Sequence, residues 1–326
     1  MNVMSDIKVI GIDPAPSKKS TVFDGDGLIE KKFSACTCIG TKIEETNFYS
    51  CKPKELINLI NYIKGCDEKI LICWDAPLTG PDFNNIKEFK NSKKVKFYEG
   101  NFSDRKIEKW LRDLIHEIKE NGNPKRQKKD SAKGVSVSHY SGCTHWTISQ
   151  YIFGLPRIGK NNSEKLPFEL VKCDECKNHI NHHIVEVHPA VAMYFWLGCL
   201  SKYKNFKKGD LKEETSTDRI KKIWDCSDNK KCSDNDNGNY NNIKEVYCKI
   251  FPNCENQPCP ENDDQLDALV AYMLGKAWLK KDSKETLKVK LFGDENTGAM
   301  LLPDSIKCDK EDCKRDFETF LSNFKK

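Results

Sequence analysis

The sequence has no apolar stretch long enough to cross a lipid bilayer. Its longest apolar run covers residues 190–200, whereas a membrane-spanning helix needs about 20 such residues. A secretory signal is not expected either, because the first residues include Asp6 and Lys8 and lead directly into a strand. We therefore expect a cytoplasmic protein with no membrane partner.

The sequence also has little excess of either positive or negative charge. Lys and Arg number 54 against 49 Asp and Glu, so the net charge of +5 permits an anionic partner without requiring one. The chain lacks any zinc-finger, helix-turn-helix or RNP-type signature, which gives sequence-specific readout of nucleic acid no support. It also lacks a Walker-type phosphate loop. Hydrophobic residues make up 38% and charged residues 32%, a polar but globular composition.

Cysteine, in contrast, is abundant, with 16 residues. In a reducing compartment these should stay thiols or bind metal instead of forming disulfides. Cys173 and Cys176 have a C-x-x-C spacing, and His179 and His183 follow closely. These four residues predict a structural Zn²⁺ site, with ordinary reduced thiols as the alternative.

Hydrophobic periodicity predicts an α/β fold with a mixed sheet. The chain opens with a meander, continues through a helix into a nearly continuous apolar strand, and carries a late helix before a short hairpin. The expected strands cover residues 7–12, 20–23, 28–33, 70–74, 183–187, 288–292 and 299–302. The expected helices cover residues 53–64, 104–120, 144–153, 189–200, 217–224, 263–280 and 309–324.

The 326 residues favour one domain with polar insertions at about 80–100, 154–181 and 225–257. A right-handed crossover through the helix at 53–64 would make strands 7–12 and 70–74 parallel neighbours. Asp13 and Asp75 follow these strands, and adjacent strands lie about 4.8 Å apart. The two carboxylates are therefore expected side by side, where they could share a metal ion.

Three further acids lie within or beside apolar segments. Asp264 and Asp267 are three residues apart and so share one face of the late helix. For Asp264, complementing the helix dipole is an equally good explanation. Asp267 lies deeper among apolar residues, as does Glu186 in the strand at 183–187, and a buried carboxylate without a partner is costly.

A cluster of such acids favours cations between them. Carboxylate oxygens are hard ligands that suit Mg²⁺ or Mn²⁺. Two such ions about 3.5–4 Å apart would promote phosphodiester hydrolysis. Glycoside hydrolysis also uses paired carboxylates, but it needs only two acids and no metal. The larger number of candidates favours the metal site.

Four motifs in this order resemble those of domain-of-unknown-function family 429, which comprises predicted nucleases of the RNase H-like fold. They are Gly11-Ile12-Asp13, Trp74-Asp75-Ala76-Pro77-Leu78, Glu186-Val187-His188-Pro189 and Asp264-Gln265-Leu266-Asp267-Ala268-Leu269. The segment 293–303 is similar to the family's closing hairpin. More broadly, the strand-end and helical aspartates resemble those of the Holliday-junction resolvases.

The resemblance implies a mixed five-stranded sheet with helices on both sides. It also implies that Asp13 bridges the metal ions, that Asp75 is a second ligand, and that Asp267 with Asp264 provides the third. Glu186 would assist them. A metal-dependent nuclease acting on DNA or RNA by two-metal-ion hydrolysis is therefore the leading hypothesis.

Basic residues supply the expected contacts to nucleic acid. The densest patch comprises Lys125, Arg126, Lys128, Lys129 and Lys133. A second basic segment at 202–208 includes aromatic residues that could stack on bases, although both segments are equally consistent with a solvated surface. Arg105 and Glu108, three residues apart, predict a helix-surface ion pair more than a phosphate contact.

Two other functions stay open at this point. One is a non-catalytic nucleic-acid-binding or scaffold protein of the same fold. The other is a nucleotide-handling ATPase of the related actin-like fold, against which the missing phosphate loop counts.

Overall fold

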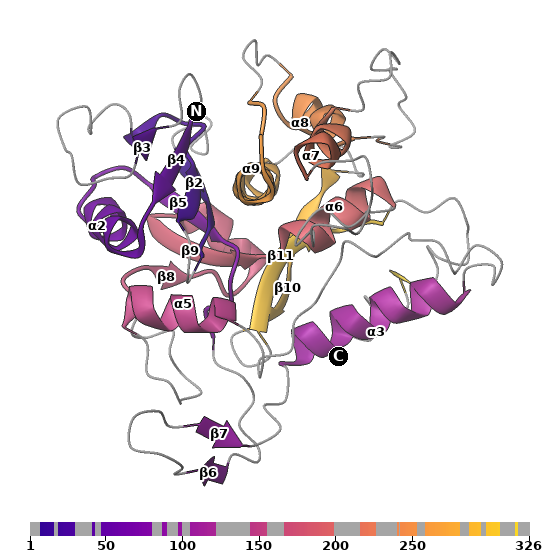
Figure 1. Cartoon of the computed structure of the whole chain (residues 1–326), viewed down its shortest axis with the longest axis horizontal. Helices are drawn as coiled ribbons and strands as arrows, with labels where there is room; N and C mark the ends of the chain where they lie inside the picture. Colours follow the sequence, from indigo (N-terminus) through magenta and orange to yellow (C-terminus); the bar gives the residue numbers. More distant parts are fainter. Residues whose placement is uncertain are drawn as a thin grey trace.

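Two parallel strands, β1 (Lys8–Asp13) and β5 (Ile70–Trp74), lie at the centre of a mixed sheet in the computed structural model of the chain (Figure 1). All five residues of β5 are buried, as expected for a strand covered on both faces. The prediction that these strands are parallel neighbours is confirmed. The structure describes residues 7–15, 19–29, 41–42, 47–79, 87–89, 97–99, 105–121, 144–154, 166–198, 216–225, 240, 242–252, 258–280, 287–294, 298–306 and 317–318.

The strands of this sheet follow the order β10-β11-β9-β5-β1-β2-β4-β3 across the described residues, and β8 pairs with β9 off this path. β9 is parallel to β5, β11 and β8, whereas β2, β4, β3 and β10 run antiparallel to their neighbours. The remaining strands of the sheet are β2 (Ser20–Phe23), β3 (Thr41–Lys42), β4 (Phe48–Cys51), β8 (Glu169–Leu170), β9 (His182–Val187), β10 (Val289–Asp294) and β11 (Gly298–Pro303).

The α/β class and the mixed sheet are therefore confirmed, but five strands is too few. The short strands β3 and β8 and the closing hairpin β10-β11 enlarge the sheet beyond the expected size. A separate hairpin, β6 (Lys87–Phe89) and β7 (Phe97–Glu99), lies within the predicted insertion at 80–100.

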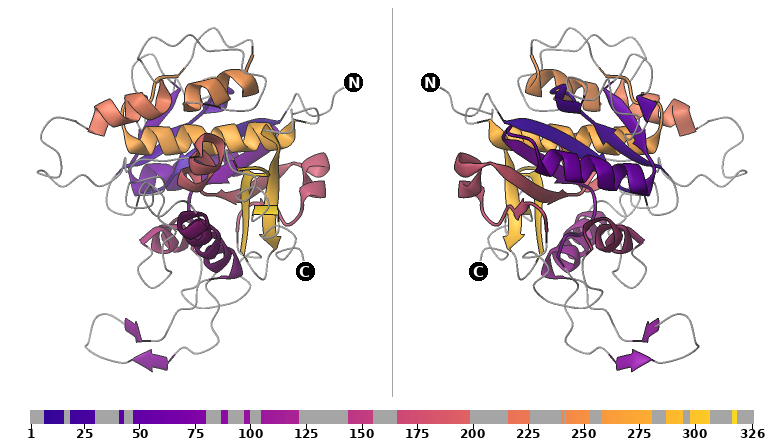
Figure 2. Two further views of the ribbon diagram at one scale, coloured as in Figure 1. Left: turned by 90° about the vertical axis from the view of Figure 1, so that its right-hand side faces the viewer. Right: turned by 90° about the vertical axis from the view of Figure 1, so that its left-hand side faces the viewer.

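Helices cover both faces of the sheet (Figures 1 and 2). α6, α7, α8 and α9 lie on one side, and α2 and α5 lie on the other. No helix in the described ranges is long and apolar enough to span a membrane. The helices are α2 (Pro53–Lys64), α3 (Lys106–Asn121), α5 (Thr144–Phe153), α6 (Pro189–Leu197), α7 (Ser216–Trp224), α8 (Ile243–Ile250), α9 (Asp263–Leu279) and the 3-10 helix η4 (Asp174–His179).

Alternate residues of the central strands enter different cores. Val9 and Leu71 belong to the core that includes α6 and α9, whereas Ile10 and Ile72 belong to the core that includes α2 and α5. This is the two-residue period of a strand with both faces buried. The same alternation decides toward which face an acidic residue of these strands is directed.

The predicted strand at 28–33 is wrong at its start, because Leu28 and Ile29 are helical. The Asp24 carboxylate accepts the backbone N–H of Leu28 at 3.0 Å and that of Ile29 at 2.6 Å. Such a cap satisfies the first N–H groups of a helix and outweighs the hairpin signal of the Asp-Gly sequence before it. The predicted last helix at 309–324 lies outside the described residues except for 317–318, which are helical.

Candidate functional site

Asp13 and Asp75 occupy neighbouring positions at the carboxyl edge of the central strands. The last aligned pair of β1 and β5 is Ile12 with Trp74. The N–H of Asp75 then donates to the Ile12 carbonyl at 2.9 Å, which extends the pairing by one residue. Asp13 is only 5% exposed, and Asp75 is half-buried. The structure thus places the two predicted site residues side by side.

Helix α9 packs directly on β1 at Gly11. A Cβ atom at this glycine would overlap the Ala268 carbonyl oxygen and lie 2.6 Å from the backbone nitrogen of Tyr272. Further along the helix, Gly275 packs against Val9, whose Cγ1 would lie 2.7 Å from an added Cβ. As α9 advances from 268 to 275, its contacts therefore move backward along β1. The helix runs antiparallel to the strand, with the two backbones almost in contact.

This direction brings the acids of α9 to the edge that holds Asp13. Asp264 precedes Ala268 by four residues, or about 6 Å of helix. Asp13 follows Gly11 by two residues, or about 7 Å of strand. Asp267 is 0% exposed and Asp264 is half-buried. The start of α9 is fixed by Asn262, whose side chain accepts the N–H of Gln265 at 2.9 Å.

The alternation of β1 also directs Asp13 toward the face that α9 covers. Val9 lies in the α9 core, and Gly11 contacts α9. Asp13 continues this series. In the neighbouring strand, Cys73 lies in the same core, and Asp75 is the next residue of that series. Asp13 and Asp75 therefore lie on the face of the sheet that α9 covers, at the edge toward which the start of α9 is directed.

Their oxygen atoms match the ligands that Mg²⁺ and Mn²⁺ prefer. Within the ranges that the structure describes, no three His, Cys, Asp or Glu side chains form a group that could hold a metal ion. The backbone places Asp13 and Asp75 side by side and directs the start of α9 toward them, and metal binding by these acids stays a prediction.

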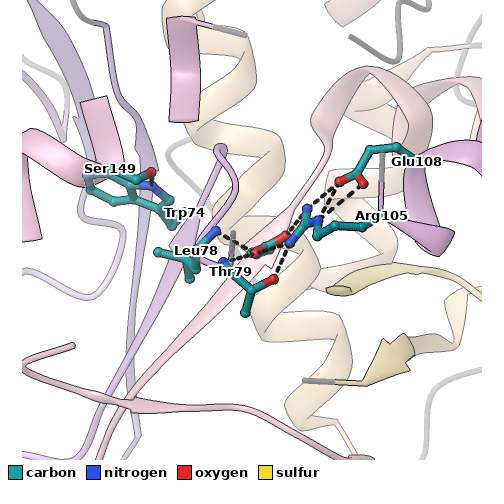
Figure 3. Close-up of polar contacts among 7 residues, drawn as sticks. Trp74, Leu78, Thr79, Arg105, Glu108 and Ser149 are labelled. Atoms are coloured by element: carbon teal, nitrogen blue, oxygen red, sulfur yellow. Dashed lines mark hydrogen bonds and ion pairs between the residues drawn. The ribbon is translucent and has the colours of Figure 1, made fainter. Parts of the chain in front are cut away.

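Glu186 is one strand further along the edge, where it aligns with Trp74. Its neighbours Val185 and Val187 face the α9 core, so Glu186 is directed toward the opposite face from Asp13. Its Oε1 accepts the backbone N–H of Leu78 at 2.5 Å and that of Thr79 at 3.1 Å (Figure 3). The role of Glu186 in assisting metal binding stays a prediction. These contacts also give Glu186 a structural role that the sequence did not indicate.

Arg105 is the counterion of Glu186. Its Nη1 lies 2.7 Å from Glu186 Oε1, and its Nη2 lies 2.7 Å from Glu186 Oε2. Nε donates to Glu108 at 2.9 Å, and Nη2 also donates to Glu108 (Figure 3). Arg105 is 2% exposed and Glu108 is 3% exposed, so the expectation of a helix-surface pair was wrong.

Burial raises the pKa of the Glu108 carboxyl, and the Arg105 charge opposes this shift. A signal for the burial was present in the sequence. Glu108 precedes Leu111 by three residues and Ile115 by seven, which places it on the apolar face of α3.

The predicted zinc ligands are only partly brought together. The sulfur atoms of Cys173 and Cys176 lie 3.2 Å apart. His183 is engaged elsewhere, because its Nε2 lies 3.2 Å from Glu169 Oε2 and its Nδ1 accepts the N–H of Asn181. His179 is exposed on η4. The sulfur pair is compatible with Zn²⁺ binding, which stays a prediction.

The basic patch of Lys125, Arg126, Lys128, Lys129 and Lys133 lies outside the described residues, as does the basic segment at 202–208. Comparison of the chain with protein-family models, curated proteins and solved structures gives no match. The resemblance to the predicted nuclease family therefore stays a prediction from motifs.

Proposed function

We propose that the protein is a divalent-metal-dependent nuclease or phosphodiesterase with an RNase H-like fold. The observation that carries this proposal is the antiparallel packing of α9 on β1 at Gly11. This packing brings Asp264 and Asp267 to the edge where Asp13 and Asp75 already lie side by side.

The order of five contiguous strands supports the fold assignment. β4, β2 and β1 form an antiparallel meander, and β5 and β9 continue the sheet in parallel. Helices cover both faces of these strands (Figure 2). These five strands have the mixed arrangement that the family resemblance implies, but the sheet is larger, with β3 added at one end, β11 and β10 at the other, and β8 paired with β9.

In this proposal Asp13, Asp75, Asp267 and Asp264 would hold Mg²⁺ or Mn²⁺, with Asp13 as the central ligand. The bound ions would activate a water molecule and stabilise the leaving oxygen of a phosphodiester. The chain's own contribution is to carry these acids on β1, β5 and α9, which are rigid elements. Carboxylates that share a site repel one another, so a cation between them is favoured.

A cleavage assay tests the proposal. The protein would be incubated with Mn²⁺ and with DNA, RNA, RNA–DNA hybrids and branched junctions. We expect cleavage of at least one substrate, and we expect Asp13→Asn to abolish it. Asp67→Asn is the matched control, because Asp67 is exposed and precedes the opposite end of β5.

Two results would count against the proposal. Absence of cleavage, together with Mn²⁺ binding by Asp13→Asn equal to that of the unaltered protein, would exclude it. Salt-dependent binding of nucleic acid without cleavage, unchanged by Asp13→Asn, would instead indicate the non-catalytic nucleic-acid-binding role.

A further inference from the structure

The segment that follows Asp75 is held by a single carboxylate of the neighbouring strand. Asp75 itself is fixed on one side by its hydrogen bond to the Ile12 carbonyl. Three and four residues later, the backbone N–H groups of Leu78 and Thr79 both donate to Glu186 Oε1. These two hydrogen bonds to one carboxylate oxygen tie the segment that follows β5 to the end of β9. Asp75 therefore lies between two anchored points.

Arg105 connects this segment to a third part of the chain. Its Nη1 donates to Thr79 Oγ1 at 2.6 Å as well as to Glu186 (Figure 3). Together with the bonds to Glu108, these contacts use all five N–H groups of the guanidinium. One buried side chain thus joins the Asp75–Thr79 segment, the end of β9 and the start of α3.

The chemistry of these contacts requires arginine and not merely a positive charge. A guanidinium presents its donors in a planar fork that can bind two carboxylates at once, whereas a lysine ammonium is a point charge on a flexible stem. The residues Thr79, Arg105, Glu108 and Glu186 are 4%, 2%, 3% and 1% exposed. Water cannot readily replace a lost contact there, so a change at Arg105 is transmitted to the segment it holds.

We propose that Arg105 is a positioning residue which, through Glu186 and Thr79, holds the Asp75–Thr79 segment and thereby fixes Asp75 at the metal-binding edge. The effect on metal binding rests on the proposed function, whereas the effect on the segment itself does not. In this account Glu186 stabilises the segment beside the metal site and does not coordinate the ions.

Two variants test this role. Arg105→Lys keeps the charge and removes the fork. Thr79→Val keeps the side-chain shape and removes only the oxygen that accepts from Nη1. Lys244→Met is the matched control, because it breaks the 2.8 Å ion pair between Lys244 on α8 and Asp225 after α7, which involves neither Arg105 nor the Asp75–Thr79 segment. Cooperative urea unfolding would establish that each variant is folded.

The first measurement is hydrogen exchange at the amides of Leu78 and Thr79. We expect Arg105→Lys to accelerate exchange at both by about tenfold, while the amide of Ile72 within β5 keeps its protection. Thr79→Val should accelerate exchange to a smaller extent. The control should leave all three amides unchanged.

The second measurement is Mn²⁺ affinity. Loss of an outer contact behind a metal ligand typically weakens binding by about 10- to 100-fold. We expect Arg105→Lys to raise the Kd by about tenfold, the lower end of that range, because it acts on Asp75 through the segment. The number of bound ions should not change.

The outcomes separate this inference from the proposed function. If the unaltered protein binds no Mn²⁺, the proposed function fails, and exchange at Leu78 and Thr79 alone decides whether Arg105 holds the segment. Unchanged exchange at these amides in Arg105→Lys would overturn the inference. Faster exchange with an unchanged Mn²⁺ Kd would also overturn it, since the segment would then move without affecting Asp75.

Discussion

The backbone N–H of Asp75 donates a 2.9 Å hydrogen bond to the carbonyl of Ile12. This bond extends the pairing of β1 and β5 by one residue and places Asp75 beside Asp13. The central sheet therefore sets where Asp13 and the backbone of Asp75 lie, and the segment after Asp75 is held by Glu186 and Arg105. Sites built on rigid elements hold their groups more accurately than sites built on loops.

The contact between Gly11 and α9 should be essential for folding. Any Cβ at Gly11 would meet the backbone of Ala268 and Tyr272, which cannot move without displacing the helix. We expect Gly11→Ala to lower the free energy of unfolding by about 3 kcal/mol or more. Gly65→Ala is the control, because an added Cβ there would lie at 3.5 Å from its nearest neighbour and should change stability by about 0.5 kcal/mol. Equal effects in urea unfolding would show that the close approach is not required.

Substitutions of the three aspartates near the start of α9, Asp263, Asp264 and Asp267, should distinguish metal binding from helix-dipole effects. Asp263 and Asp264 lie in the first turn, so changing either to Asn should cost about 0.3–1 kcal/mol of stability without metal. Asp267→Asn should have the largest effect on Mn²⁺ affinity, Asp264→Asn a smaller one, and Asp263→Asn none. If Asp264→Asn and Asp263→Asn bind Mn²⁺ equally well, Asp264 serves the helix dipole alone.

His183 should make stability depend on pH. Burial lowers its pKa, and the nearby Glu169 charge opposes this shift. The folded state therefore binds fewer protons at this residue than the unfolded state, so stability is lost as the pH falls below the ordinary histidine value of about 6.5. His183→Gln should flatten the fall in unfolding free energy between about pH 7 and pH 5.

Glu169→Gln should act in the opposite direction, because it removes the charge that favours protonated His183. The fall in stability over the same pH range should then become steeper. Identical pH profiles for His183→Gln and the unaltered protein would show that His183 does not contribute.

Much of the fold could be predicted because its signals are local. The structure gives α2, β5 and α5 the predicted bounds. Proline at a helix start, a continuous apolar run and helical periodicity each act within a few residues. The strands β3 and β8 were not predicted because two residues carry no detectable alternation. The third strand of the meander is β4 and not 28–33, because the Asp-Gly signal at 24–27 precedes a helical turn. α8 was not predicted because it follows the polar segment 225–242, whose composition is typical of a surface loop.

The candidate site could also be predicted in part from the sequence. Acids at the ends of apolar segments indicated Asp13, Asp75 and Asp267, and the structure gathers these positions at one edge. The role of Glu186 could not be predicted, because Arg105 lies 81 residues earlier in the chain. The alternation of side chains along β9 directs Glu186 to the face opposite Asp13. This direction relative to Asp13 can be assigned only when the register of β5 and β9 is known.

Calorimetric titration with Mn²⁺ tests the central claim most directly. The proposed function predicts that the unaltered protein and Asp67→Asn bind two ions with similar affinity, and that Asp13→Asn loses this binding while remaining folded. Binding by Asp13→Asn with the stoichiometry and Kd of the unaltered protein would contradict the proposal that Asp13 is the central metal ligand.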